Sequence, residues 1–112
     1  MRRENRLTAP KDFSRIYQTG KRFRTNSVTA VGIIDDTRAP RIGITSSKRI
    51  GNAVARNRAR RRLRAAATGV VPSLRPGATA VLQASPAALS SSWEKLETDV
   101  RRALAGVGLS DG

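Results

Sequence analysis

The chain has 112 residues, a length that suits one compact domain. It contains neither cysteine nor histidine, which excludes disulfides, thiol nucleophiles and cysteine or histidine zinc ligands, and removes the usual proton shuttle near neutral pH. Its net charge of +14 is carried by 18 arginines and 4 lysines against 8 acids, so we expect a polyanion as its partner.

The N-terminal half predicts a helix followed by strands. Thr8 is placed to cap a helix over about residues 9–18, with Pro10 in its first turn and Gly20 as its stop. Alternating and β-branched patterns predict a short edge strand at 21–25 and strands at 27–34 and 41–46, with a turn or hairpin loop over 35–40.

The C-terminal half predicts a helix, a strand and a final helix. Asn52 is the expected N-cap of a helix that runs to Thr68 and ends at Gly69, and residues 78–84 form the next strand. Ser91 to Glu94 matches a capping box with Glu94 at N3, and an apolar stripe follows at helical spacing: Trp93, Leu96, Val100 and Leu104. We expect a frayed tail over 106–112.

This order of elements predicts one mixed sheet with helices packed on it, in a single domain over 1–112 whose ordered part spans about 5–105.

The helix after Asn52 has two contrasting faces. Small and apolar residues form a packing stripe of Ala55, Ala59, Leu63 and Ala66. The opposite side carries Asn57, Arg60, Arg61 and Arg64, flanked by Arg56 and Arg58. No Asp or Glu occurs from Thr37 to Trp93, although a merely solvated helix usually mixes signs to gain ion pairs. We therefore favour phosphate binding over a solvated surface, and Asn57 is either an RNA or loop contact or a tolerated exposed residue.

Aromatic residues are few and their spacing leaves their role open. Phe13 and Tyr17 share one helix face, where they either anchor the helix to the sheet or form a stacking platform for unpaired bases. Trp93 is expected in the core or as a helix staple.

The eight acids do not predict a catalytic centre. Asp35 and Asp36 occupy a turn, and the other acids are expected at helix ends or on the surface. A two-metal nuclease needs convergent carboxylates, so we expect a binding protein with no catalytic or metal-ligating residues of its own. The N-terminus lacks the apolar run of a signal peptide and no segment approaches the ~20 apolar residues of a membrane span, which predicts a cytoplasmic protein without a membrane partner.

The segment from Arg41 to Arg64, R-I-G-I-T-S-S-K-R-I-G-N-A-V-A-R-N-R-A-R-R-R-L-R, closely resembles the signature of the bacterial ribonuclease P protein family. That signature runs R-x-G, S-K-K-x-G-x-A-V and R-N-R-x-K-R-x-x-R, with Arg49 and Arg60 here in place of lysine. An N-terminal R-L followed by D-F, the G-K-R-F segment and an aromatic opening the last helix extend the similarity over about residues 5–105.

The resemblance implies an α+β fold, an α/β sandwich around a four-stranded sheet with a left-handed βαβ crossover, related to a small-subunit ribosomal protein and a domain of elongation factor G. It implies an RNA-binding cofactor of an RNA enzyme that removes the 5′ leader of precursor tRNA. The Mg²⁺ ions and the catalysis would belong mainly to the RNA. The implied partners are the ribonuclease P RNA and precursor tRNA, without an obligate protein partner.

Position by position, the resemblance implies two binding regions. The catalytic RNA would contact Arg56, Asn57, Arg58, Arg60, Arg61 and Arg64, and the leader cleft would be lined by Phe13, Tyr17, Lys48 and Arg49. Two departures are the missing strand aromatic near Val31 and Ala65 in place of a frequent Glu. A general RNA-binding module and a DNA-compacting protein remain alternatives, but charge alone would not require Gly51 or Asn57.

Overall fold

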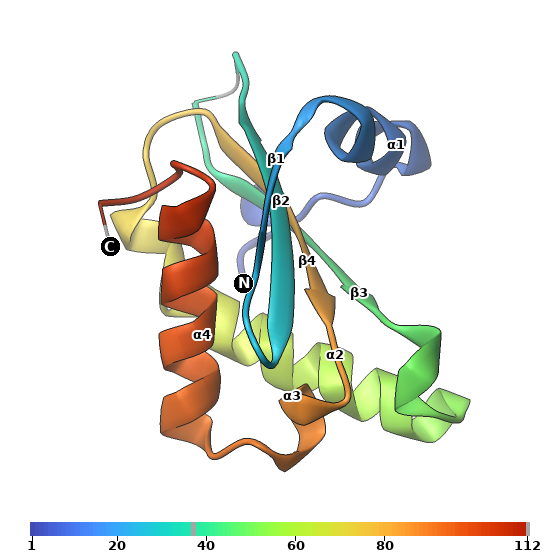
Figure 1. The fold of residues 1–112 in the computed structure, drawn as a ribbon. Coiled ribbons are helices and arrows are strands. Elements are labelled where there is room, and N and C mark those ends of the chain that lie inside the picture. Colours follow the sequence, from blue (N-terminus) through green and yellow to red (C-terminus); the bar gives the residue numbers. More distant parts are fainter. Residues whose placement is uncertain (37, 112) are drawn as a thin grey trace.

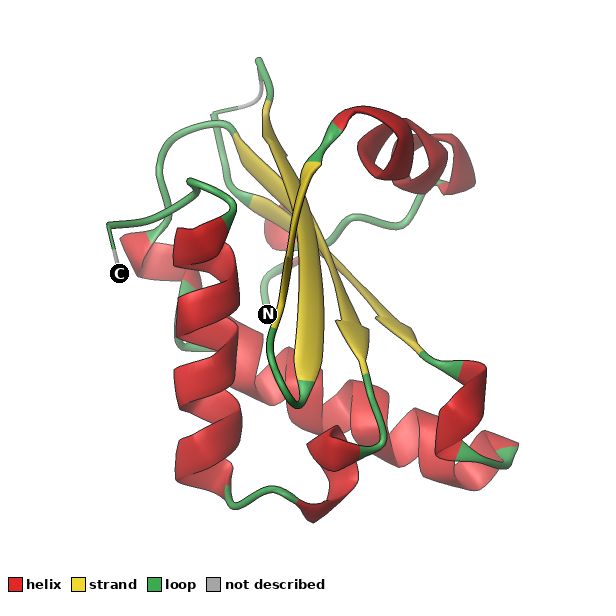
Figure 2. Cartoon of the chain, in the orientation of Figure 1, coloured by secondary structure: helices red, strands yellow, loops and turns green. Residues whose placement is uncertain are grey.

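A twisted four-stranded sheet forms the centre of the computed structural model, which describes residues 1–36 and 38–111 (Figure 2). The strands are β1 Lys21–Arg24, β2 Val28–Ile34, β3 Arg41–Ser46 and β4 Ala78–Ala84, in the order β1-β2-β4-β3. β1–β2 and β2–β4 pair antiparallel, whereas β3 and β4 pair parallel. The predicted mixed sheet and all four predicted strands are therefore confirmed. The predicted turn joins β2 to β3, but its Thr37 and the terminal Gly112 lie outside the described residues.

Helices cover the two faces of the sheet unequally. The helices are α1 Pro10–Thr19, α2 Ala53–Thr68, the one-turn α3 Ala87–Ser90 and α4 Trp93–Gly106. α2 and α4 pack on one face, and α1 lies on the other (Figure 1). In Figure 1, β3 and β4 both point down the page, β4 ends to the left of β3, and α2 lies behind them. The crossover is therefore left-handed, against the general preference for right-handed crossovers.

The larger hydrophobic core lies between the sheet and the pair α2 and α4. Residues of even number in β2 and β4 point towards it, and Ala59 and Leu63 of α2 meet Leu96 and Val100 of α4 there. The predicted packing stripe of α2 is confirmed, except that Ala55 is only half-buried. Small residues in α2 allow the helix to approach the sheet closely while its arginines remain on the outside.

A smaller core seats α1 on the opposite face. Ile16 packs on Val31 and Val81, the central pair of the sheet, with Phe13 at its side. A Cβ built on Gly43 would lie 2.5 Å from Phe13 Cζ, so the ring rests on the bare backbone of β3. Any larger residue at position 43 would displace the ring and hence α1.

Two of the predicted helix starts are shifted by one residue. α1 begins after Ala9, which provides no side-chain cap, so Thr8 is not the N-cap. α4 is capped by Ser92, whose Oγ accepts a hydrogen bond from Lys95 N at 3.1 Å. Glu94 is therefore at N2 and does not complete a capping box, because the two adjacent serines offered alternative registers.

The last helix and the tail differ from expectation in three respects. Trp93, expected in the core or as a staple, is 43% exposed because it begins α4 beyond the packed stripe. Asp99, expected on the surface, is completely buried. Val107 and Leu109, expected in a frayed tail, are buried against the sheet, where the Leu109 carbonyl accepts a hydrogen bond from Arg75 N.

Candidate nucleic-acid interface

The entry to α2 is a sharply turned segment at the end of β3. A 3-10 turn at Lys48–Ile50 starts at Ser47, whose Oγ accepts a hydrogen bond from Arg49 N at 3.1 Å. Gly51 then adopts φ +126°, a conformation that favours glycine, and Asn52 caps α2 by accepting from Ala55 N at 2.9 Å. The predicted Asn52 cap is confirmed. The positive φ of Gly51 and the cap made by Asn52 explain why these residue types occur here, independently of charge.

The outer side of α2 is cationic and open to solvent. Asn57, Arg58 and Arg61 are exposed, whereas Arg56, Arg60 and Arg64 are half-buried. Arg60 donates a hydrogen bond to Ser46 Oγ at 2.9 Å, which holds its guanidinium beside the end of β3. The six residues predicted to contact the catalytic RNA thus lie outside the packing stripe of α2, and none of them is buried.

Arg62 differs from its neighbours because its guanidinium is used within the fold. It donates to the carbonyl of Ala88, and to the carbonyl of Ser91 at 2.9 Å. These carbonyls belong to α3 and to the linker after it, so Arg62 ties α2 to the segment before α4. One arginine of the helix is therefore structural, and it is not among the predicted RNA contacts.

Asp12 and Asp35 pair with arginines that lie outside α2. Asp35 accepts from Arg15 at 2.7 Å and from Arg41 at 3.3 Å, and Asp12 lies within 4 Å of the same two arginines. The hydrogen bond from Arg15 and that from Asp36 N hold the pKa of Asp35 below its usual value. Within the described residues, no arginine of α2 has a carboxylate within 4.0 Å. The positive charge of α2 is therefore not neutralised by the protein itself.

A second open surface lies on the face of the sheet that carries α1. One register row across this face, Arg22, Val31, Val81 and Gly43, is largely apolar and supports α1. The next row consists of four polar residues in register: Arg24, Thr29, Gln83 and Thr45. Three residues of this second row, Arg24, Thr29 and Gln83, line an open hollow.

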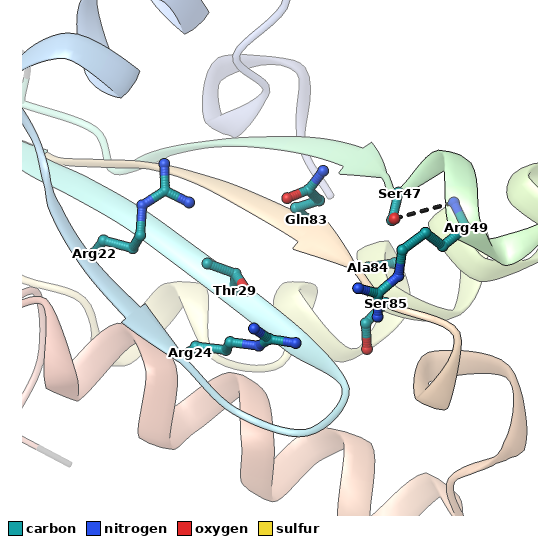
Figure 3. A pocket seen from close by; sticks show the side chains of 8 residues that line it. All are labelled: Arg22, Arg24, Thr29, Ser47, Arg49, Gln83, Ala84 and Ser85. Atoms are coloured by element: carbon teal, nitrogen blue, oxygen red, sulfur yellow. Dashed lines mark hydrogen bonds between the residues drawn. The ribbon is translucent and has the colours of Figure 1, made fainter.

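The hollow encloses about 270 Å³ and is rimmed by cations from two separate segments. Arg22 and Arg24 come from β1, and Arg49 reaches in from the turn before α2 (Figure 3). Thr29, Gln83, Ser47 and Ser85 contribute uncharged polar groups, and no acid lines the hollow. A neighbouring hollow of about 490 Å³ at the β3 edge is lined by Thr45, Lys48, Arg56 and Arg60 among others, so the basic surface continues to α2.

Of the four residues predicted to line the leader cleft, two line these hollows and two lie on α1. Arg49 lines the first hollow and Lys48 the second. Tyr17 on α1 is 39% exposed, whereas the Phe13 ring is half-buried on Gly43 and mainly seats the helix. Arg22, Arg24, Thr29 and Gln83 were not predicted. The alternation in K-R-F-R, which puts both arginines on one face with Phe23 on the other, is the signal that would have identified two of them.

Across residues 1–36 and 38–111, there is no group of three or more Asp or Glu side chains placed to hold a metal ion. No helix in that part of the chain is long and apolar enough to cross a bilayer.

Comparison with known proteins places this geometry in a family. The family model described as Ribonuclease P matches residues 1–108. The "Ribonuclease P protein component" of Clavibacter michiganensis is 34% identical over 103 residues, which are 91% of each chain. The protein of the same name from Pseudarthrobacter chlorophenolicus is 40% identical over 101 residues, covering 89% of this chain and 74% of the relative.

Solved structures share the fold at lower sequence identity. The RNase P protein of Staphylococcus aureus superposes with a TM-score of 0.80 at 21% identity, covering 95% of this chain and 97% of the other. The RNase P protein of Thermotoga maritima gives 0.78 at 18% identity, covering 91% and 96%. With a family model spanning nearly the whole chain and relatives above 30% identity, this chain belongs to the bacterial ribonuclease P protein family.

Proposed function

We propose that this chain is the protein cofactor of a ribonuclease P, which binds the catalytic RNA and the 5′ leader of precursor tRNA. The observation that carries the proposal is the charge of α2, which has six arginines and no acidic residue. One of them, Arg62, binds two backbone carbonyls within the fold, and the other five remain available for a ligand. Like charges on one helix destabilise it unless an external anion compensates them. A phosphate backbone provides such anions at regular spacing, and arginine binds them in two places.

The catalytic RNA binds the outer side of α2. The exposed Arg58 and Arg61 contact phosphates directly, and Asn57 between them offers an amide for a backbone or base contact. Arg56, Arg60 and Arg64 are half-buried and present restricted guanidinium orientations. The hydrogen bond to Ser46 already restricts the Arg60 side chain, so less conformational entropy is lost when RNA binds.

The leader binds the face of the sheet beside α1. Tyr17 presents an exposed ring on which an unpaired base stacks, and Phe13 holds α1 in place beneath it. Lys48 and Arg49 lie between this face and α2, so they contact the strand as it passes from one surface to the other. The two hollows are lined by neighbouring residues, such as Ser47 and Lys48, and this proximity supports simultaneous binding of leader and catalytic RNA.

Removal of the leader is an endonucleolytic hydrolysis, and we assign its chemistry to the RNA partner. Mg²⁺ prefers oxygen ligands, and the described residues gather no three carboxylates that would hold it. The RNA and the substrate would hold most of these ions, which would supply activation of water and stabilisation of the leaving oxygen. The protein's own residues bind and orient the two RNAs in the cytoplasm.

The test is cleavage of a precursor tRNA by a bacterial ribonuclease P RNA at low Mg²⁺, with and without the protein. We expect strong stimulation with a correct mature 5′ end. Arg58→Ala should reduce stimulation, and Arg101→Ala, which removes another exposed arginine, from α4, is the matched control. Tight RNA binding without stimulation would instead support a general RNA-binding module, and equal binding to any duplex DNA would support a compaction protein.

A further inference from the structure

β1 is an edge strand whose outer side is unpaired. In the order β1-β2-β4-β3 its one neighbour is β2, and among the described residues no further strand or bridge joins its other side. On the opposite edge of the sheet, Arg6 pairs with Ile42 of β3. Figure 1 shows β1 at the margin of the sheet with α4 beside it. An open edge of this kind offers its backbone groups to an added strand.

The free backbone groups of this edge belong to Arg22 and Arg24. Thr25 N donates to the Val28 carbonyl at 2.8 Å, so these two residues form a hydrogen-bonded pair at the hairpin. Hydrogen-bonded pairs alternate along an antiparallel ladder, so Phe23 also bonds to β2, whereas the arginines on either side of it do not. The N–H and carbonyl groups of Arg22 and Arg24 therefore point outward, at the spacing that an added antiparallel strand requires.

A groove lies beside this edge, between β1 and α4. It encloses about 370 Å³ and is lined by Phe23 and by one face of α4, which carries Thr98, Arg101, Arg102 and Ala105. The half-buried Phe23 ring rests on Gly106, where any Cβ would overlap it, so the ring is held in a fixed position. An apolar side chain of an added strand would pack against Phe23 and Ala105.

The charge around the groove favours an acidic occupant. Arg101 and Arg102 are exposed at its rim, and no acid lines it. Within the described residues, Arg101 has no carboxylate within 4.0 Å, and Arg102 approaches only Asp99, at 3.8 Å. A second copy of this chain would set K-R-F-R against itself, and like charges directly opposite one another destabilise such a pair.

We propose that the outer edge of β1 and this groove form a docking site for an extended acidic segment of a protein partner. The segment adds to β1 as an antiparallel strand, with an apolar residue opposite Phe23 and acids two residues before and after it, near Arg101 and Arg102. An RNA backbone satisfies arginines but offers acceptors only, whereas the edge presents alternating donors and acceptors. The docking site includes neither α2 nor the residues predicted to line the leader cleft, so it goes beyond the proposed function.

The probe is a synthetic heptapeptide, T-E-T-V-T-E-T, with blocked ends and a fluorescent label, and the full chain is titrated into it at physiological salt. The valine and both glutamates share the face that meets the groove, because side chains alternate along a strand. We expect Ala105→Glu, which fills the groove and repels the acids, to weaken binding at least about tenfold. Arg101→Ala should weaken it about threefold, whereas Arg58→Ala on α2 should change it by less than about twofold.

Two methylated peptides test the backbone pairing. Methylation of the two threonine nitrogens beside the valine removes the donors that face Arg22 and Arg24, whereas methylation of the valine nitrogen alters a group that points away from β1. The first peptide should bind at least about tenfold more weakly than the parent, and the second should bind equally well. Equal affinities of all three peptides would overturn strand addition, and a loss confined to the methylated valine would overturn the antiparallel register.

The remaining measurements identify the other occupants. The peptide should stay bound when ribonuclease P RNA is added, and Arg101→Ala and Ala105→Glu should leave precursor tRNA cleavage by the reconstituted holoenzyme unchanged. Displacement of the peptide by the RNA, or loss of cleavage in both variants, would assign the edge to RNA and overturn the proposal. A dimer in sedimentation velocity that the peptide dissociates would make a second copy the occupant, with the same consequence. If the wild-type protein stimulates no cleavage, the proposed function fails, but the peptide titrations still decide this proposal.

Discussion

The buried carboxylate of Asp99 provides a sharp test of how α4 is held to the sheet. Its Oδ2 accepts hydrogen bonds from Ser27 Oγ at 2.7 Å and from Ser27 N at 3.3 Å. Lys95 Nζ lies 3.3 Å from Oδ1, and Arg102 lies 3.8 Å from the same atom. The carboxylate therefore joins the middle of α4 to the residue that precedes β2.

The magnitude follows from what Asp99→Ala would leave behind. Hydrogen bonds to a charged group contribute about 1.5–3 kcal/mol each, and an unsatisfied buried donor costs about 1–3 kcal/mol. The two ion pairs add little because Lys95 and Arg102 are about half exposed. We expect Asp99→Ala to lower the free energy of unfolding by about 2–4 kcal/mol.

The acid dependence gives an independent readout. Burial raises the pKa of Asp99, but the hydrogen bond from Ser27 and the interactions with Lys95 outweigh it, so the pKa is lowered overall. A lowered pKa in the folded state means that the stabilisation is complete above the unfolded value of about 3.9 and is lost as the pH falls through the folded value. The difference in stability between wild type and Asp99→Ala should therefore shrink in this acidic range.

The assay is urea unfolding followed by circular dichroism from pH 7 to pH 2, since urea leaves the ionic strength unchanged. Glu97→Ala on the same helix is the control, because no ion pair of Glu97 occurs within the described residues. It should change stability by less than about 0.5 kcal/mol. Equal midpoints for Asp99→Ala and Glu97→Ala, or a difference that persists unchanged at pH 2, would refute the role of the buried carboxylate.

Three further predictions concern α2 and α1. Arg58→Ala should weaken binding of the ribonuclease P RNA and leave the melting temperature unchanged, because Arg58 is exposed. Arg62→Ala should instead lower the unfolding free energy by about 1–3 kcal/mol, because two backbone carbonyls lose their hydrogen-bond donor. The opposite pattern in filter binding and thermal melts would contradict the assignment of the two arginines. Leu63→Asp should unfold the domain or cost at least about 4 kcal/mol by burying a charge, and an unchanged melting curve would overturn the packing stripe. Gly43→Val should displace the Phe13 ring and α1, so we expect weaker leader affinity and an unchanged affinity for the catalytic RNA. Normal leader affinity would show that α1 does not shape the cleft.

The sequence by itself determined the elements and the main binding helix. Local sequence patterns predicted all four strands and the three longer helices, and most of these elements carry a repeat of apolar residues. The absence of acids from Thr37 to Trp93 is likewise a property of the linear chain, and it predicted the unneutralised face of α2. The Asn52 cap depends on neighbours within three residues, and for that reason it was also predictable.

Only the tertiary structure decided which polar residues share a surface. The row from Arg24 to Thr45 is assembled by strand order and register, which join residues up to 59 positions apart in the chain. The burial of Asp99 depends on a partner 72 residues away, and the packing of the tail depends on Arg75. Arg62 and Arg58 look alike in sequence, but α3 lies beside only one of them. Local pattern reports the preference of each segment, whereas long-range pairing decides which side chains meet, and that pairing is a property of the folded chain alone.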